Sequence, residues 1–204
     1  MRPPLTAAEA AEQLDVSRET RDRLQTYLDV LCQWQRAINL VGASTLQDPW
    51  RRHILDCGQL LRHLQAHTRT LVDLGSGAGL PGLVLAIMGV PEVHLIESNG
   101  RKAQFLREAA RRTGAPAEVH AQRIEAMTPF RADVVTARAL APVAGLVGLA
   151  QPFLGAGSTV LLLKGRKAGA ELTAAEQCWH MRIERFPSLS DAGGVVLRLS
   201  EITA

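Results

Sequence analysis

Three glycines at alternate positions, Gly75, Gly77 and Gly79, follow a short apolar run that contains the carboxylate of Asp73. Glycine allows positive φ and lets a ligand approach the backbone with no Cβ in the way. The apolar run after the glycines favours a helix, whose N-terminus attracts carboxylates and phosphates. Glu97 ends the next apolar run, where an acid can accept the hydrogens of ribose hydroxyls. These residues predict a nucleotide-cofactor site, with a ligand-free strand–helix turn as the alternative.

The spacing of the glycines narrows the class of cofactor. A dinucleotide fingerprint has its third glycine where this chain has Leu80, and Gly79 comes one residue too early. The resulting D-x-G-x-G-x-G pattern resembles the first motif of the seven-strand S-adenosylmethionine (AdoMet) methyltransferases. We therefore expect AdoMet, and not NAD, to be the cofactor.

The strands and helices that would position this site alternate from residue 70 onward. Apolar residues fill the predicted strands, which is typical of a parallel sheet covered by helices on both faces. Only residues 187–193 separate the last two strands, which indicates an antiparallel hairpin. The expected fold is α/β, a mostly parallel seven-strand sheet of the Rossmann-like AdoMet-dependent methyltransferase type. The predicted strands are 70–74, 93–97, 117–120, 132–136, 158–163, 180–186 and 194–199, and the predicted helical segments are 80–89, 99–113, 123–127, 142–151 and 168–177.

Residues 1–65 are predicted to form an N-terminal helical cap on the methyltransferase domain, residues 66–204, the two making one compact unit. Apolar residues recur there at helical spacing. The second helix is expected to end within residues 39–42. The expected helix starts lie at Thr6, in a capping box with Glu9, at Ser17 and at Asp48.

The composition suits one α/β domain with an appendage, since the chain has 204 residues and 47% hydrophobic content. Three scattered cysteines, Cys32, Cys57 and Cys178, form no C-x-x-C pair and indicate a reducing compartment. The N-terminus lacks an apolar signal-peptide core. The most apolar long window, residues 137–157, is interrupted by an arginine and two prolines. We therefore expect a cytoplasmic protein without a membrane span.

Basic residues follow several of the predicted strand ends. The net charge of +3 permits a nucleic-acid partner without requiring one. Ligands of open α/β sheets bind at the carboxyl ends of the strands, so these cations would lie on the rim of the site and contact RNA phosphates. A bias of a GC-rich genome toward arginine is the alternative. The candidate RNA-binding residues are Arg101, Lys102, Lys164, Arg166 and Lys167. The six histidines show no metal-ligand spacing, and we expect no metal.

Two further segments would border the cofactor in this kind of fold. After the third predicted strand, Ile124 would pack on the adenine, and the backbone of Ile124 and Glu125 would meet its edge; an ordinary helix start is the alternative. The fourth predicted strand ends in Thr136-Ala-Arg138, facing the methyl group. Arg138 is the candidate catalytic residue, with a salt bridge to Asp73 or Glu97 as the alternative.

The residues at this strand end also limit the reaction. Many base methyltransferases carry an Asn/Asp-Pro-Pro-aromatic motif there to bind an exocyclic amine. This chain lacks that motif, which argues against amine methylation. No Pro-Cys pair ends a strand, so carbon methylation through a cysteine adduct is disfavoured.

Two specific motifs are Gly79-Leu-Pro-Gly82 after the glycine loop and Arg138-Ala139 at the fourth strand end. They are the most specific parts of a resemblance to the RsmG (GidB) family, which runs from about residue 20 to the end of the chain. Departures are small, with Cys57 where serine is usual and Val41 where threonine is common. The further matching segments are Asn39-Leu40, Arg52-His-Ile-Leu-Asp56, Val72–Gly79, Glu97–Lys102, Arg123–Glu125 and Leu163-Lys-Gly165.

The resemblance implies an AdoMet-dependent enzyme that methylates N7 of guanine G527, in the 530 loop of bacterial 16S ribosomal RNA in the small subunit. Guanine N7 has a free lone pair and no proton to lose, so the reaction needs alignment and a favourable field in place of a general base. The cofactor contacts that the resemblance implies are Gly75, Leu80, Ile124, Glu125 and Arg138.

Other functions stay open at this point. An AdoMet methyltransferase acting on a small molecule or a protein would show no salt-dependent affinity for RNA. A non-catalytic nucleotide-binding module and an NAD-dependent oxidoreductase are further alternatives, which titration with NAD and with AdoMet would separate.

Overall fold

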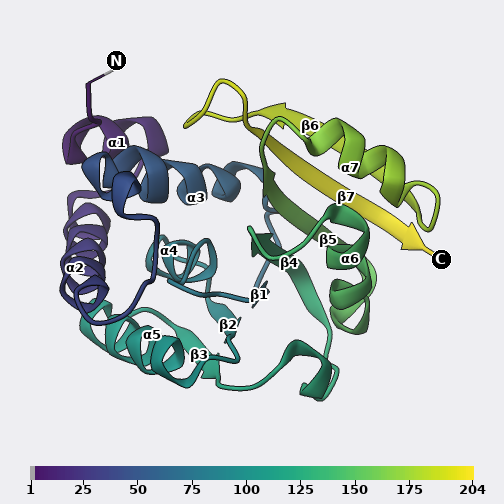
Figure 1. The fold of residues 1–204 in the computed structure, drawn as a ribbon, viewed down its shortest axis with the longest axis horizontal. Helices are drawn as coiled ribbons and strands as arrows, with labels where there is room; N and C mark the ends of the chain where they lie inside the picture. Colours follow the sequence, from purple (N-terminus) through teal and green to yellow (C-terminus); the bar gives the residue numbers. More distant parts are fainter. Residues whose placement is uncertain (1–2) are drawn as a thin grey trace.

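A seven-stranded sheet in the order β3-β2-β1-β4-β5-β7-β6 runs through the computed structural model, which describes residues 3–204 (Figure 1). The first five strands are parallel, and β7 runs antiparallel to both β5 and β6. This topology confirms the predicted fold class and the C-terminal hairpin. The strands are β1 (Thr70–Leu74), β2 (Glu92–Ile96), β3 (Ala117–His120), β4 (Ala132–Arg138), β5 (Leu154–Lys164), β6 (His180–Pro187) and β7 (Val195–Thr203).

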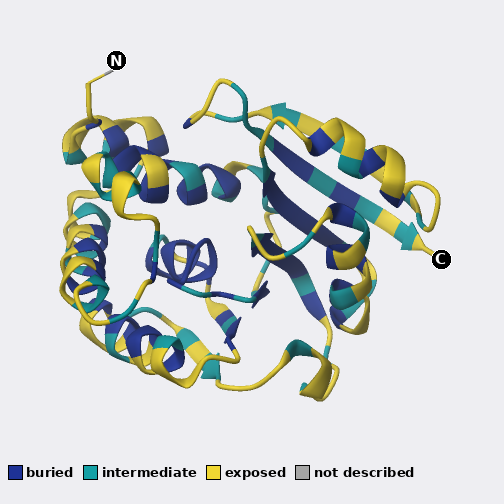
Figure 2. Cartoon of the chain, in the orientation of Figure 1, coloured by how far each residue is buried: buried dark blue, intermediate teal, exposed yellow. Residues whose placement is uncertain are grey.

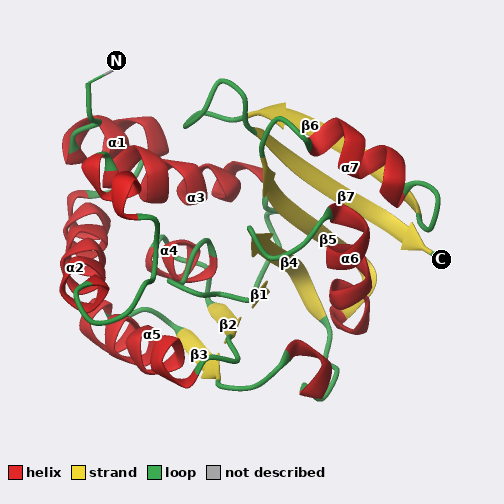
Figure 3. Ribbon diagram, viewed as in Figure 1, coloured by secondary structure: helices red, strands yellow, loops and turns green. Residues whose placement is uncertain are grey.

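Helices precede the sheet and cover both of its faces (Figure 3). The α-helices are α1 (Ala7–Leu14), α2 (Arg18–Gln35), α3 (Asp56–Gly58), α4 (Gly82–Ile87), α5 (Gly100–Thr113), α6 (Val143–Ala150) and α7 (Ala168–Ala175). Short 3-10 turns cover Ala43–Gln47, Gln59–His63, Ile124–Ala126 and Gln151–Phe153, and a π-helical turn covers Trp50–Leu55. No helix in the described part of the chain is long and apolar enough to cross a membrane.

The first two helices begin where their capping residues predict. The Oγ1 of Thr6 accepts from the N–H of Glu9 at 3.2 Å, and the Glu9 carboxylate accepts from the Thr6 N–H at 2.8 Å. The Oγ of Ser17 accepts from the N–H of Thr20 at 3.1 Å. Such caps satisfy backbone donors that have no partner within the helix.

The end of the second helix and the form of the third differ from expectation. Helix α2 ends at Gln35, whose side chain bonds to the backbone of Leu40 and Val41 and stops the helix before residues 39–42. The third predicted helix, expected to start at Asp48, is a run of π, α and 3-10 turns from residue 50 to residue 63, and a separate 3-10 turn precedes it. Hydrophobic spacing specifies the buried face of such a segment but not its hydrogen-bond pattern.

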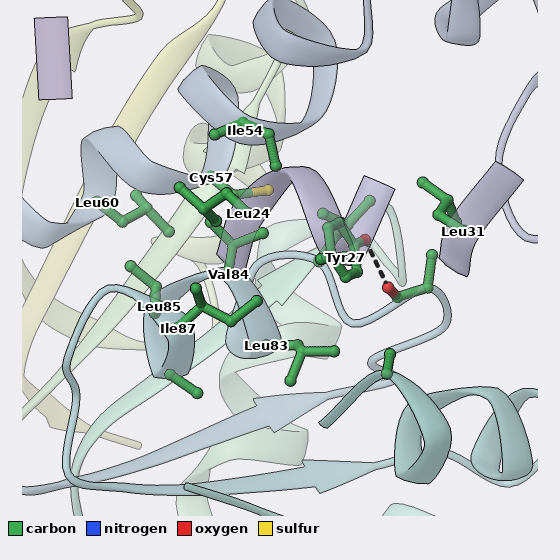
Figure 4. Close-up of a cluster of buried hydrophobic side chains, with 14 of the residues drawn as sticks. Leu24, Tyr27, Leu31, Ile54, Cys57, Leu60, Leu83, Val84, Leu85 and Ile87 are labelled. Carbon is green, nitrogen blue, oxygen red and sulfur yellow. Dashed lines mark hydrogen bonds between the residues drawn. The ribbon is translucent and has the colours of Figure 1, made fainter. Parts of the chain in front are cut away.

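Two hydrophobic clusters lie on opposite faces of the sheet. One packs α6 and α7 against the sheet, and the other packs α2, α4, α5 and the turns of residues 43–63. Helix α4 is buried along its whole length (Figure 2). Leu24 and Tyr27 of α2 and Ile54 lie among the side chains of α4, and the Tyr27 hydroxyl donates to the Ala78 carbonyl at 2.8 Å (Figure 4). The division at residues 65 and 66 stays a prediction, but both parts share this cluster.

Candidate functional site

Six of the nine predicted cofactor residues line a pocket of about 370 Å³ at the carboxyl ends of β1, β2 and β4, which we call the cofactor pocket after this prediction. Gly75, Gly77, Glu97, Ile124, Glu125 and Arg138 all line it, from four separate segments of the chain. The other lining residues are Ile96, Ser98, Lys102, Gln122, Arg123, Ala139, Leu140 and Leu149.

Gly77 provides the test of whether this pocket fits a nucleotide cofactor. Its φ is +55°, a value that favours glycine. A Cβ built there would meet only the Gly75 carbonyl, at 3.8 Å, so protein atoms leave open space at this point. Gly75, with φ +62°, is different because a Cβ there would lie 2.8 Å from Leu140. The loop therefore leaves a ligand room to approach the backbone at Gly77.

Glu97 holds the glycine loop against the start of α5. Its Oε2 accepts from the Gly77 N–H and its Oε1 from the Asn99 N–H, both at 2.8 Å. Asn99 in turn caps α5, where its Oδ1 accepts from the N–H of Arg101 and of Lys102. Each carboxylate oxygen has a second lone pair, so Glu97 can also accept from ribose hydroxyls in the pocket. An acid at this position fits the predicted cofactor.

Three of the predicted cofactor residues do not line the pocket: Asp73, Gly79 and Leu80. A Cβ on Gly79 would lie 2.8 Å from the Cβ of Leu83, so this glycine permits close packing of the loop on α4. Leu80 is buried in the core. Asp73 is fully buried, and its Oδ1 accepts from the Thr136 hydroxyl at 2.8 Å. Direct contact of these residues with a cofactor stays a prediction.

The burial of Asp73 has a consequence for stability. Burial raises the pKa of Asp73 from 3.8 to about 6, although the bond from Thr136 acts in the opposite direction. Between these two pH values the folded chain binds more protons than the unfolded chain, so stability falls as pH rises through this window.

We expect Asp73→Asn to remove this pH dependence. Chemical denaturation of both proteins from pH 4 to pH 8 measures it. The unfolding free energy of the variant minus that of the wild type should increase by on the order of 2–3 kcal/mol from pH 4 to pH 7. It should be flat above pH 7. A difference that does not change with pH would contradict the buried, protonatable carboxyl.

Arg138 ends β4 and forms a wall of the cofactor pocket. Its Nη1 donates to the Asp56 Oδ2 and to the Arg52 carbonyl, both at 3.2 Å. The salt-bridge partner is thus Asp56, and not Asp73 or Glu97 as the sequence-based alternative had it. Among the described residues these bonds use Nη1 alone, which leaves the Nε and Nη2 hydrogens to a ligand. Ala139, the next residue, has φ +54°, a strained value for a residue with a Cβ.

A second pocket, of about 430 Å³, shares Arg138 and Ala139 with the cofactor pocket. Its walls come from residues 40–45, the π-helical turn, the end of β5 and the loop before β7. The Oγ1 of Thr45 lies 3.0 Å from the Nε2 of His53, and both residues line this second pocket. Burial and then the nearby Arg138 charge lower the pKa of His53 to about 4, so its imidazole is neutral at physiological pH.

Several residues of this second pocket were not predicted as site residues from the sequence. Asp56 and His53 belong to a segment that matched family motifs, which was the available signal. Asp191 lies in the loop before β7, where nothing in the sequence marked it. Arg52 lies 3.9 Å from Asp191, so the pocket rim carries both charges.

The predicted RNA-binding cations differ in their surroundings. The Nζ of Lys164 donates to the Ala141 carbonyl at 2.7 Å and to the Glu171 Oε2 at 2.9 Å, and its side chain is 9% exposed. Lys164 therefore holds the segment after β4, although it also lines the second pocket. Lys102 is half-buried beside the cofactor pocket. Arg101, Arg166 and Lys167 are exposed.

The fold and the glycine-loop pocket match what is expected of the AdoMet-dependent methyltransferase class. The structure is similar to a TehB-like SAM-dependent methyltransferase from Corynebacterium glutamicum, with a TM-score of 0.54 and 14% identity, over 87% of this chain and 98% of the other. At this identity the similarity establishes the fold alone.

Sequence comparison identifies the family. The family described as rRNA small subunit methyltransferase G (GidB) matches residues 20–192. A ribosomal RNA small subunit methyltransferase G from Rhodospirillum rubrum is 56% identical over 97% of this chain and 98% of its own length. The one from Rhodospirillum centenum is 58% identical over 98% and 93%. The chain belongs to this family, which confirms the predicted family and AdoMet as the cofactor.

Proposed function

We propose that this protein methylates N7 of guanine G527 in the 530 loop of bacterial 16S ribosomal RNA, in the cytoplasm, with AdoMet as methyl donor. The observation that carries the proposal is the pair of pockets that share Arg138 and Ala139. One pocket suits the cofactor, and the other is large enough for a nucleobase and opens beside the same strand end. The names of the relatives support ribosomal RNA as the substrate.

Alignment is the main task of this chain's residues. When bound, AdoMet supplies an electrophilic methyl group on its sulfonium. Arg138 lies between the pockets and orients both ligands, held in place by Asp56 and the Arg52 carbonyl. Guanine N7 carries no proton, so no side chain has to remove one. The neutral imidazole of His53 lines the second pocket and has no part in proton transfer.

The charges of the second pocket suit guanine. Asp56 and Asp191 provide carboxylates that can accept from guanine N1–H and the exocyclic amine, while Arg52 can donate to O6. N7 methylation leaves a positive charge on the base, and the two carboxylates stabilise that charge as it develops. An adenine would present a donor where guanine has O6, facing the cations, so the pocket favours guanine.

The experiment that tests the function uses labelled AdoMet with bacterial small subunits that lack the modification. We expect label at N7 of one guanine in the 530 loop, G527, found by mapping the labelled base. Parallel reactions with protein-free 16S RNA and with RNA-free ribosomal proteins separate the substrates. Label on protein alone, or on another base, would overturn the proposal in favour of the alternative AdoMet methyltransferase.

The exposed cations give a separate prediction about RNA affinity. Replacing Arg101, Arg166 and Lys167 together with alanine should weaken binding and flatten its dependence on salt, because an RNA held through fewer phosphates releases fewer counterions. The slope of log K against log salt should fall by about 0.7–0.9 for each phosphate that the variant no longer neutralises. Filter binding or fluorescence anisotropy at several salt concentrations measures it.

The matched control removes the same number of charges elsewhere on the surface. Arg111→Ala, Arg112→Ala and Arg182→Ala change residues on α5 and β6 that do not line either pocket. Equal slopes for both triple variants would show that RNA binding does not use the rim.

A further inference from the structure

Two histidines and a glutamate lie together on one face of the sheet, at the edge that β3 forms. His94 of β2 is paired with Glu118 of β3, and His120 follows two residues later. Side chains two residues apart point to the same face of a strand. The register therefore gathers three ligand-type side chains, which no spacing along the sequence reveals.

The distances between the ligand atoms suit a small divalent cation. The Nδ1 of His94 lies 2.9 Å from the Nε2 of His120 and 3.7 Å from the Oε2 of Glu118. One ligand atom from each residue lies within 4.8 Å of the others. Tetrahedral zinc with bonds of about 2.0–2.2 Å needs ligand atoms roughly 3.3–3.5 Å apart. Small side-chain rotations bring the three atoms to this separation.

The surroundings of His94 favour ligation through Nδ1. Its Nε2 lies 3.2 Å from the Oε1 of Glu92, which favours the tautomer whose Nε2–H donates to that carboxylate and whose lone pair is on Nδ1. This carboxylate–histidine arrangement orients many zinc-binding histidines. Phe130 packs against the His94 ring at 4.6 Å between centroids, and the His94 side chain is 12% exposed. His94 is thus oriented before any ion arrives.

We propose that His94, Glu118 and His120 bind a zinc ion, with water as the fourth ligand. Two imidazoles and a carboxylate suit zinc better than magnesium or calcium, which prefer oxygen ligands alone. The sequence predicted no metal because these three residues have no metal-ligand spacing along the chain. The ion would tie the edge strand β3 to β2, just before the chain enters the cofactor pocket at Gln122. Its role there is to hold the edge of the sheet, separate from the methyl transfer.

The test compares zinc binding in chelator-treated full-length protein. Cys32 and Cys178 are exposed thiols that bind zinc themselves, so every protein carries Cys32→Ser and Cys178→Ser. Competition with a chromogenic chelator measures affinity and stoichiometry, and the visible spectrum of bound Co²⁺ reports tetrahedral geometry. We expect one site per chain, lost in His120→Gln and weakened at least about tenfold in Glu118→Gln, which removes an exposed ligand and spares the core.

His180→Gln on β6 is the matched control, since it removes an exposed histidine far along the sheet order from β3. This variant should bind zinc as the parent does. The proposal is overturned if the parent binds no more zinc than the His94→Gln/His120→Gln double variant. It is also overturned if Glu118→Gln and His120→Gln bind as tightly as the parent, because the histidine pair is then only a hydrogen bond.

Discussion

Arg138→Ala should lower the rate of methyl transfer at least about 100-fold while the protein stays folded, because misplacing reacting groups by about 1 Å has effects of this size. Arg138 is the charged residue of the two that both pockets share, and its Nη1 is fixed by Asp56 and the Arg52 carbonyl. Alanine would leave the donor and the base without the side chain that orients both. Single-turnover methyl transfer to modification-free small subunits measures the rate.

Two companion variants separate orientation from charge. Arg138→Lys keeps the charge but loses the planar guanidinium, and should recover little of the activity. Asp56→Asn keeps Arg138 but weakens its ion pair with residue 56, and should cause a smaller loss of activity. Circular dichroism and thermal melts check folding, because the Asp56 carboxylate loses its partner in Arg138→Ala. Full activity in a folded Arg138→Ala protein would remove this residue from the mechanism.

Glu97→Gln should weaken AdoMet binding roughly 10- to 100-fold, since a part-buried N–H left without an acceptor costs about 1–3 kcal/mol. The two carboxylate oxygens each accept from a backbone N–H, one from Gly77 and one from Asn99. A glutamine has one oxygen, so one of these N–H groups would face an amide hydrogen donor. The glycine loop or the start of α5 must then shift. Isothermal titration calorimetry with AdoMet measures the affinity.

Glu125→Gln is the matched control for this prediction. Glu125 lines the same pocket but is exposed, and only its backbone is expected to meet the adenine. Its change to glutamine should alter the affinity for AdoMet little. If Glu97→Gln binds AdoMet as tightly as wild type, the carboxylate does not organise the cofactor site.

The sequence predicted best the parts of the fold whose signal is local. The run around β1 combines a buried strand, glycines and a helix start, and the structure places its glycine loop at the cofactor pocket. Gly114 ends α5 in a left-handed conformation at φ +62°, as the predicted helix end at residue 113 requires. Solid apolar strands also predicted a parallel sheet, because both of its faces have to be covered.

The parts that the sequence did not predict depend on contacts between distant segments. A Cβ on Gly79 would lie 3.0 Å from Leu106 of α5, a packing contact that the spacing of the glycines does not reveal. Lys164 was predicted on the rim, yet Glu171 and the Ala141 carbonyl occupy its ammonium group. Asp56 contacts Arg138 across 82 positions of the chain, a distance that motif spacing does not describe.

The wide turn over Trp50–Leu55 has a consequence for chains of different length. Its Asp56 N–H bonds to the Arg51 carbonyl five residues back, one residue more than ordinary helical winding uses. A π turn rotates less per residue than an α-helix, so the loss of one residue there would be offset by a return to ordinary α-helical winding. Asp56 would then keep its direction toward Arg138, and the sheet and glycine loop would keep their places. A protein shortened by one residue at this turn is therefore expected to retain the contact between Asp56 and Arg138.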